Sequence, residues 1–312
     1  MKIQVRKFSF ISKVDKVPIR GVCMVPEHPV GILQMVHGMG EHKGRFCHFM
    51  EEMAKRGYIT CMHDTRGHGN SLKSIEDMGY FYDGKEQGCI ADMYCVTRQM
   101  RKAYPGLPLI LYGHSLGALM VRSYLREYEG AVDGVVLAGC PSYNFLVPFV
   151  VPFIKGLQII LGERCRISLF QRLLQWNYAR RFYNEDKYFA WLSSDASVAE
   201  VFKMDNRCIF TYTLNGFETL LRLEYATYGE KIYETQCENL PILFVSGMDD
   251  PCYTNERMWK HSLMRMKRLG YKNIKEIRYE GMRHELHNEP KRAIYYEDLY
   301  EFLEGVNICK KE

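Results

Sequence analysis

The sequence predicts an α/β protein with a mostly parallel central sheet flanked by helices. Short apolar runs with strand character alternate with longer runs of helical periodicity, this alternation stops over one internal stretch, and it then resumes. Strands that alternate with helices form parallel sheets through right-handed crossovers. The interruption therefore indicates an insertion into a single sheet domain.

Strand signals dominate the part of the chain before the insertion, and helical periodicity separates the later strands. Six strands are expected there, over residues 3–11, 19–25, 30–36, 58–63, 107–112 and 132–138, with helices over 46–56, 87–104 and 118–126.

The inserted stretch is rich in aromatic residues. Between residues 143 and 233, 19 of 91 residues are Phe, Tyr or Trp, against 13% of the whole chain. Because the insertion leaves the sheet just after a strand's carboxyl end, where open α/β sheets bind ligands, it is expected to roof the site. Strands are expected again at 240–245 and 274–279, with helices at 255–269 and from about residue 290. The predicted domains are a core of residues 1–140 and 234–312 and a helical cap of residues 141–233.

Composition and charge are those of an ordinary folded enzyme. The formal net charge is +5, and the basic residues are scattered apart from residues 260–275 and a terminal lysine pair, so no nucleic-acid partner is expected. The eleven cysteines form no C-x-x-C pair and no hydrophobic leader follows Met1, which favours a reducing, cytoplasmic location. Pro148 and Pro152 interrupt the longest apolar stretch, 145–161, which is therefore not expected to span a membrane.

A nucleophile is expected at Ser115. This residue is the centre of the pentapeptide Gly113-His-Ser-Leu-Gly117, between the apolar run 107–112 and the helical run 118–126. Such a strand-to-helix turn strains the serine backbone and exposes its hydroxyl. It also requires the two glycines, because a Cβ there would collide with the neighbouring strand or helix.

The carboxylate expected to orient the base follows the strand at 240–245. Asp249 and Asp250 are adjacent there, and successive side chains point in different directions, so at most one faces the base. Pro251 restricts Asp250 to extended backbone, which favours Asp250. The alternative is that both aspartates only form a polar turn and cap the next helix.

The base is expected at His284, in the loop after the strand at 274–279. His287 is the second candidate, but it lies nearer to the start of the final helix. Each of Ser115, Asp250 and His284 comes just after a predicted strand, in the order expected when a serine turn is followed by its acid and its base.

Two backbone N–H groups are expected to stabilise the oxyanion of acyl transfer, each contributing about 2.7 to 4 kcal/mol. One belongs to Leu116, directly after the nucleophile. The other is assigned to Met39 in the loop at 37–42, where Gly38 and Gly40 permit close backbone approach.

A metal site was the competing interpretation of four histidines near this loop. They form no H-x-x-x-H or H-E-x-x-H pattern, so no metal is expected. The predicted chemistry calls for no organic cofactor either. The four are His37, His42, His63 and His68.

Five segments together carry a family resemblance: the pentapeptide at 113–117, the loops at 37–42, 64–71 and 279–284, and the turn at 247–250. As a set they resemble the monoacylglycerol lipase and lysophospholipase group of α/β-hydrolases, the serine aminopeptidase-type hydrolase family. The resemblance covers nearly the whole chain outside the cap.

This resemblance implies the α/β-hydrolase fold, with the cap inserted after the sixth strand. It also implies Asp250 as the acid, Met39 and Leu116 as the oxyanion donors, and a loop-anchoring role for Arg66 and His68.

The predicted activity is hydrolysis of a carboxylic ester through an acyl-enzyme on Ser115. A monoacylglycerol, a lysophospholipid or another single-chain acyl ester is the expected substrate. A small-ester or aryl-ester carboxylesterase and an aminopeptidase of the same family remain alternatives. A non-catalytic ligand-binding protein on a hydrolase scaffold is a more remote one, because all three triad residues are available.

Phe145, Phe149 and Phe153 of the cap are predicted to bind substrate. The stretch 145–161 suits an acyl tunnel or a surface that enters a lipid interface, whereas simple packing on the core explains it equally well. The expected partners are thus an acyl ester and, by peripheral contact, a lipid interface. The oligomeric state has no signal in the sequence.

Overall fold

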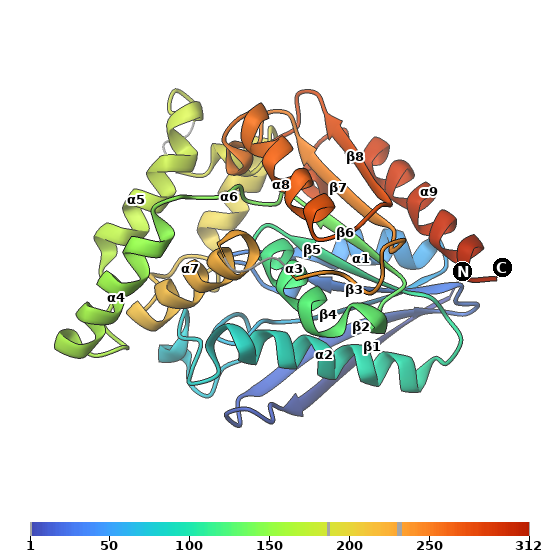
Figure 1. Cartoon of the computed structure of the whole chain (residues 1–312), viewed down its shortest axis with the longest axis horizontal. Helices are drawn as coiled ribbons and strands as arrows, with labels where there is room; N and C mark the ends of the chain where they lie inside the picture. Colours follow the sequence, from blue (N-terminus) through green and yellow to red (C-terminus); the bar gives the residue numbers. More distant parts are fainter. Residues whose placement is uncertain (1, 186–187, 230–232, 312) are drawn as a thin grey trace.

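A twisted sheet of eight strands forms the centre of the molecule in the described part of the chain (Figure 1). The computed structural model describes residues 2–185, 188–229 and 233–311, with side chains up to Val306. The strand order is β1-β2-β4-β3-β5-β6-β7-β8. The strands are β1 (Ile3–Ile11), β2 (Pro18–Pro26), β3 (Gly31–Val36), β4 (Tyr58–His63), β5 (Leu109–His114), β6 (Gly134–Ala138), β7 (Ile242–Gly247) and β8 (Ile274–Tyr279).

The sheet is mostly parallel, as predicted. Only β2 pairs antiparallel with its neighbours β1 and β4, and the other neighbouring strands in the described sheet are parallel. Since β3, β5, β6, β7 and β8 run in the same direction, their carboxyl ends meet at one edge, where α/β sheets bind ligands.

Helices cover both faces of the sheet because successive strand residues point to opposite sides. In β5, Leu109 and Leu111 pack with residues of α2, α3 and α8, whereas Ile110 and Tyr112 pack with residues of α1 and α9. The five helices are α1 (Cys47–Lys55), α2 (Lys85–Ala103), α3 (Leu116–Tyr128), α8 (Glu256–Arg268) and α9 (Arg292–Lys311).

A group of helices separates β6 from β7, which confirms the predicted insertion after the sixth strand. Figure 1 shows these helices together at one end of the molecule, beside the carboxyl ends of the parallel strands. The limits 1–140, 141–233 and 234–312 for core and cap remain a prediction. The inserted helices are α4 (Val147–Leu161), α5 (Ser168–Ala179), α6 (Ala196–Met204) and α7 (Leu214–Tyr228).

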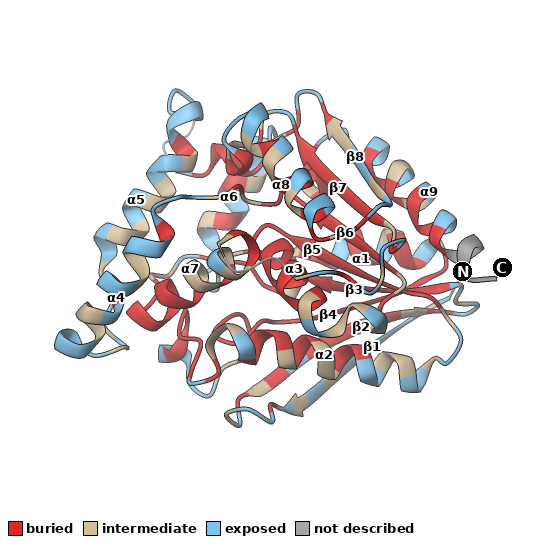
Figure 2. Ribbon diagram, in the orientation of Figure 1, coloured by how far each residue is buried: buried red, intermediate tan, exposed pale blue. Residues whose placement is uncertain are grey.

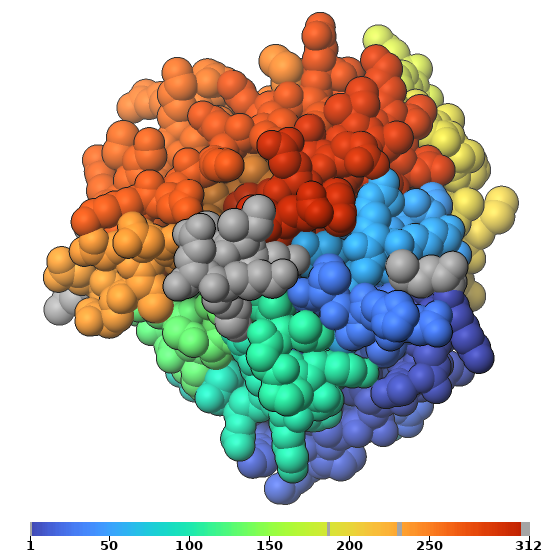
Figure 3. Space-filling model, turned by 90° about the vertical axis from the view of Figure 1, so that its right-hand side faces the viewer, coloured from blue at the N-terminus to red at the C-terminus, as the bar shows by residue number. Residues whose placement is uncertain are grey.

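The inserted helices form an inner and an outer part. α7 lies against α3 and α2, and nine of its residues are buried. α4 packs along α7, but α4 and α5 are mostly exposed or half-buried (Figure 2). Figure 3 shows a face away from them, built mainly from the N-terminal strands, α2 and the C-terminal elements. None of the described helices has both the length and the apolar composition needed to cross a membrane.

Candidate active site

The turn between β5 and α3 holds Ser115 in a backbone conformation that non-glycine residues rarely adopt, with φ 55° and ψ −118°. Its N–H donates to the carbonyl of Ala138 at 2.8 Å. A Cβ on Gly113 would lie 2.4 Å from the carbonyl oxygen of Gly117, and a Cβ on Gly117 would lie 2.3 Å from that of Val36. Both glycines are therefore required by close backbone approach, as the pentapeptide predicts.

The loop after β7 directs Asp250, rather than Asp249, toward His284. Oδ2 of Asp250 lies 3.0 Å from Nδ1 of His284, and both residues are at most 2% exposed. Asp250 has extended backbone and begins the 3-10 turn Pro251–Tyr253. Asp249 instead pairs with Arg181 at 2.7 Å, with 41% of its side chain exposed.

The electrostatics of Asp250 favour its ionised form. Burial pushes the pKa of this carboxyl upward. The imidazole of His284 and hydrogen bonds from the N–H of Cys252 (2.8 Å) and Oγ of Ser246 (3.0 Å) outweigh burial and hold the pKa below its usual value. A buried carboxylate is thus available to accept Nδ1–H of His284 and fix the ring.

The hydroxyl of Ser115 and the ring of His284 belong to neighbouring loops, but none of the hydrogen bonds among described residues joins them. The ring of His114, next to the serine, lies 4.7 Å from the ring of His284 between centroids. Nε2 of His284 lies 3.9 Å from Sγ of Cys252. Catalytic hydrogen bonds commonly close only when substrate is bound.

The loop at 37–42 lies directly against the serine. A Cβ on Gly38 would lie 2.9 Å from Cβ of Ser115. The N–H of Gly38 is taken by Oε2 of Glu41 at 2.7 Å. In the part of the chain that the structure describes, the N–H groups of Met39 and Leu116 have no acceptor. The loop therefore leaves Met39 N–H available beside Ser115, together with the first N–H of α3.

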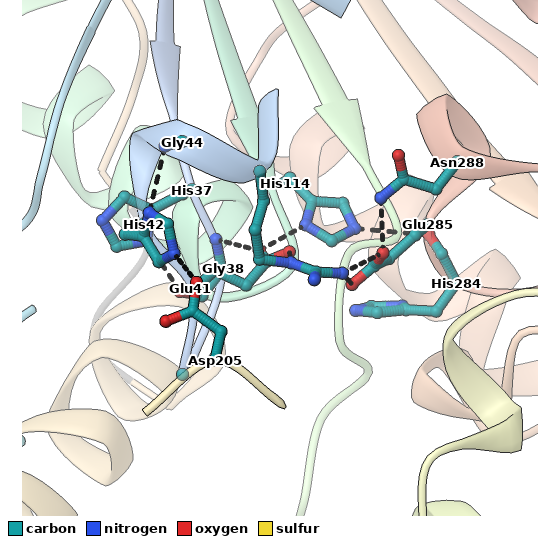
Figure 4. Close-up of polar contacts among 12 residues, drawn as sticks. His37, Gly38, Glu41, His42, Gly44, His114, Asp205, His284, Glu285 and Asn288 are labelled. Atoms are coloured by element: carbon teal, nitrogen blue, oxygen red, sulfur yellow. Dashed lines mark hydrogen bonds and ion pairs between the residues drawn. The ribbon is translucent and has the colours of Figure 1, made fainter. Parts of the chain in front are cut away.

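A buried network of charges links this loop to the loop of His284 (Figure 4). Glu41 contacts Nδ1 of His114 at 3.0 Å and Nε of Arg45 at 3.6 Å. Arg45 binds both carboxylate oxygens of Glu285, at 2.8 and 2.6 Å. His287, the second candidate base, stacks on Phe46 with ring centroids 4.3 Å apart. It is not among the hydrogen-bond partners of Asp250 in the described part of the chain.

Two aromatic side chains of the cap reach the loops of the candidate site. The ring of Trp191 lies 4.9 Å from the ring of His284. The hydroxyl of Tyr212 accepts the N–H of Gly40 at 2.8 Å and lies 2.6 Å from Nε2 of His68. The cap is thereby tied to both the histidine loop and the loop at 37–42.

Three of the four histidines weighed as metal ligands are engaged in hydrogen bonds. Nε2 of His37 accepts the N–H of Thr65 at 2.9 Å, and Nε2 of His42 lies 2.7 Å from Oδ2 of Asp205. His68 is held between Tyr212 and the carbonyl of Arg66. These contacts fasten loops to each other and to the cap.

The three cap residues predicted to bind substrate lie in the first half of α4 or just before it. Phe145, Phe149 and Phe153 are 70%, 73% and 58% exposed, and their role in substrate binding remains a prediction. Sequence reasoning assigned no role to Trp191 or Tyr212, because nothing local distinguishes them from the other aromatic residues of the cap. It also assigned none to His114, although the position of this histidine directly before Ser115 could have indicated a role in the site.

Comparisons with known proteins agree with this fold. The family model described as serine aminopeptidase, S33, matches residues 27–291. A monoacylglycerol lipase of Mycolicibacterium smegmatis is 30% identical over 138 residues, 43% of this chain and 46% of that protein. Human monoglyceride lipase is 30% identical over 112 residues, 35% of this chain and 34% of that protein. The chain thus spans less than half the length of these two curated relatives.

Solved structures are similar over almost the whole chain. A carboxyl esterase from Bacillus coagulans in complex with glycerol superposes with a TM-score of 0.87 at 22% identity, covering 98% of this chain and 100% of that one. A soluble variant of monoglyceride lipase from Saccharomyces cerevisiae gives a TM-score of 0.72 at 17% identity, covering 98% and 95%. At these identities the likeness shows the shared α/β-hydrolase fold.

Proposed function

We propose that this chain, which belongs to the serine aminopeptidase (S33) hydrolase family, hydrolyses carboxylic esters through an acyl-enzyme on Ser115. The observation that carries the proposal is the buried hydrogen bond between Asp250 and His284, beside a serine held at φ 55°. An imidazole oriented by a carboxylate next to a strained serine is the arrangement that activates a hydroxyl for acyl transfer.

In the proposed reaction, Oγ of Ser115 attacks the ester carbonyl carbon and its proton passes to Nε2 of His284. The carbonyl becomes an oxyanion held by the N–H groups of Met39 and Leu116. The C–O bond to the alcohol then breaks and the alcohol leaves with the proton from His284. A water molecule attacks the acyl-enzyme by the same route, which releases the carboxylic acid and restores Ser115.

The substrate proposed is a single-chain acyl ester such as a monoacylglycerol or a lysophospholipid. Its support is the similarity to curated monoglyceride lipases together with an apolar cap over the carboxyl edge of the sheet. We expect the turnover of p-nitrophenyl esters to rise with acyl length, and a monoacylglycerol or a lysophospholipid to be cleaved faster than an aminoacyl anilide. Rates that peak at the acetate ester would favour a small-ester carboxylesterase, and preferential cleavage of the anilide would favour an aminopeptidase.

Covalent labelling tests the serine mechanism directly. A fluorophosphonate probe is expected to label the wild-type protein and not the Ser115→Ala variant. Ser123→Ala is the matched control, because Ser123 lies two turns further along α3, and it is expected to be labelled like the wild type. A folded wild-type protein that stays unlabelled would favour a non-catalytic ligand-binding protein.

The outer helices of the cap are proposed to contact a lipid interface. α4 and α5 expose a surface of large apolar side chains and contain one charged residue each, the cations Lys155 and Arg172. A large exposed apolar patch with few charges is typical of interaction surfaces and of helices that enter the headgroup region of a bilayer. The exposed apolar residues of this surface are Phe145, Leu146, Phe149, Phe153, Ile159, Ile160, Leu161, Leu169, Leu173 and Trp176.

Vesicle sedimentation tests this contact. The wild-type protein is expected to sediment with phosphatidylcholine vesicles, and the variant with both Phe149→Ser and Phe153→Ser to remain in the supernatant. Ile75→Ser is the control, because Ile75 is 67% exposed but lies outside the cap. Equal sedimentation of all three proteins would remove the proposed lipid contact.

A further inference from the structure

His114, the residue before the proposed nucleophile, contacts an oxygen atom with each of its two ring nitrogens. Nδ1 lies 3.0 Å from Oε2 of Glu41, and Nε2 lies 3.3 Å from the carbonyl oxygen of His284. The ring is 1% exposed. Figure 4 shows it between the loop of Glu41 and the loop of His284.

Both contacts require a donor from the ring. A peptide carbonyl only accepts, and so does an ionised carboxylate. A neutral imidazole has one N–H, so either tautomer would turn a nitrogen lone pair toward an oxygen lone pair in a buried site. Only the doubly protonated ring can donate to Glu41 and to His284 at the same time.

We infer that His114 is a buried imidazolium that ties the loop of Met39 to the loop of His284, and that it is a positioning residue for catalysis. This inference rests on the proposed function for its catalytic meaning. It adds to that function a group whose charge holds two catalytic loops together without touching the substrate.

Glu41 faces Nδ1 as an ionised carboxylate. It also accepts the N–H of Gly38 at 2.7 Å and lies beside Arg45. Burial alone would raise its pKa, but the neighbouring His114 outweighs burial and holds the pKa of Glu41 well below its usual value. Conversely, burial lowers the pKa of His114, and Glu41 overcomes this so that the pKa lies above its usual value.

The remaining charged and titratable groups around His114 are Glu285, Arg45, His287 and the pair of Asp250 and His284. Glu285 and Arg45 form a buried ion pair, which balances, as Glu41 and His114 do. His287 packs edge-on against His114 with ring centroids 5.3 Å apart, and burial together with the charge of His114 holds its pKa well below the usual value, so it is neutral. A neutral His114 would leave the buried carboxylate of Glu41 without the positive charge that faces it, which is costly.

The two contacts of His114 act on two parts of the proposed catalytic site. Glu41 holds Gly38 by its N–H, and this sets the direction of the next peptide N–H, that of Met39. The bond to the carbonyl of His284 holds the backbone of the base. In addition, the charge of His114 lies 4.7 Å from the ring of His284, so removing this charge is expected to alter the pH profile of catalysis.

Nitrogen NMR of the wild-type protein tests the charge state without using activity. In protein labelled with ¹⁵N-histidine, both ring nitrogens of His114 are expected to carry protons from about pH 6 to pH 8, the range over which an unperturbed imidazole loses its charge. The signals are assigned by their loss in His114→Asn. A ring with one unprotonated nitrogen at pH 6 would overturn the inference.

The pH profile of activity tests the positioning role. His114→Asn is uncharged and carries its two N–H donors on a single nitrogen, in place of one on each of two ring nitrogens. We expect kcat to fall by about 10²-fold, the cost of a displacement of about 1 Å. We also expect the acidic limb of the kcat/KM profile to move to higher pH. An unshifted limb would overturn the role, because a change of packing alone does not move it.

Controls separate this inference from the proposed function. His28→Asn, at an exposed position, is expected to leave kcat and the pH profile unchanged. If the wild-type protein is not labelled by the fluorophosphonate, the proposed function fails while the NMR result still decides the charge of His114. Should His114→Asn fail to fold, Glu41→Gln replaces it. With the carboxylate removed, one ring N–H of His114 is expected to disappear at pH 8, and retention of both would overturn the pairing.

Discussion

The indole of Trp191 packs on the imidazole of His284, with ring centroids 4.9 Å apart and planes inclined by 45°. Trp191 is 7% exposed and His284 is 2% exposed. The carbonyl of Trp191 also accepts the N–H of His284 at 3.4 Å, and the next carbonyl, that of Leu192, accepts the N–H of Glu285 at 2.7 Å. A turn of the cap therefore packs against the ring and the backbone of His284, the proposed base.

Replacing Trp191 by Ala is expected to lower both stability and turnover. Loss of a buried aromatic ring costs about 3–5 kcal/mol of unfolding free energy, and water then reaches His284. Urea unfolding and kcat on a soluble short-chain p-nitrophenyl ester measure the two effects. Trp176→Ala removes an indole that is 57% exposed on α5 and is expected to change neither quantity much. If Trp191→Ala kept the wild-type kcat, the contact between Trp191 and His284 would have no part in catalysis.

Substitution of the two adjacent aspartates distinguishes the acid. Asp250→Asn is expected to lower kcat by about 10⁴-fold, because an amide no longer holds the imidazole in the required tautomer. Asp249→Asn removes only the exposed ion pair with Arg181, a contact of about 0–1 kcal/mol, and is expected to keep nearly full activity. Steady-state kinetics on one ester substrate compare the two variants. The reverse order of effects would transfer the role to Asp249.

Tyr212→Phe is expected to loosen the loop that carries Met39. The variant leaves the N–H of Gly40 and Nε2 of His68 buried without a partner, at a cost of about 1–3 kcal/mol for each group. Because burial lowers the pKa of His68 to about 3, its ring is neutral and needs the phenol as donor.

Tyr212→Phe is expected to lower kcat with little change in KM. The fall in kcat is expected to be smaller than the roughly 10²- to 10³-fold fall that removal of one oxyanion donor causes. Tyr225→Phe is the control, since Tyr225 is 38% exposed on α7. A variant with wild-type kcat and wild-type stability would contradict the link between Tyr212 and this loop.

Acid is expected to destabilise the protein partly through Asp64. Its carboxylate accepts the N–H groups of Lys43 (2.8 Å) and Asn70 (2.7 Å) and pairs with the ammonium of Lys43. Burial raises the pKa of Asp64, but Lys43 and these hydrogen bonds outweigh it, so the pKa lies below the usual 3.8. A depressed pKa in the folded state stabilises the protein above the pKa of the unfolded chain, and this stability is lost as pH falls through the folded value.

Urea unfolding from about pH 7 to pH 3 measures this dependence. Below about pH 4 the unfolding free energy of the wild-type protein is expected to fall. Asp64→Asn is expected to be less stable at pH 7 and to lose less stability toward acid. Glu27→Gln, at an exposed position, is expected to follow the wild-type curve. An equally steep acid limb in Asp64→Asn would show that Asp64 contributes nothing to it.

Elements with a local signal could be predicted closely from the sequence. The helix expected at 255–269 is α8 (Glu256–Arg268), and Asn255 caps it by accepting the N–H of Met258. The serine turn was equally local, since Gly113 and Gly117 meet backbone within a few residues or in the adjacent strand. Strand patterns and the change of rhythm after β6 likewise indicated a parallel sheet with an insertion, because periodicity reflects which faces are buried.

Contacts between distant segments could not be predicted in this way. The local sequence favoured Asp250 over Asp249 through the proline that follows, and the family resemblance implied the same residue. The direction of β7 relative to the loop after β8 decides which carboxylate meets His284. For the same reason, local sequence does not distinguish among the 19 aromatic residues between 143 and 233. Only the folded structure shows that Trp191 contacts His284 and that Tyr212 contacts the loop at 37–42.

The sequence by itself determined an α/β sheet, an inserted helical cap, and a serine turn followed in order by an acid and a histidine, because each of these depends on neighbouring residues. Tertiary structure alone decided how these parts meet. His114 is bonded to Glu41 and to His284, which are 73 and 170 residues away in the chain. Whether a histidine carries a charge depends on the acceptors around both nitrogens, and here those are supplied by loops after β3 and β8, which become neighbours only when the sheet forms.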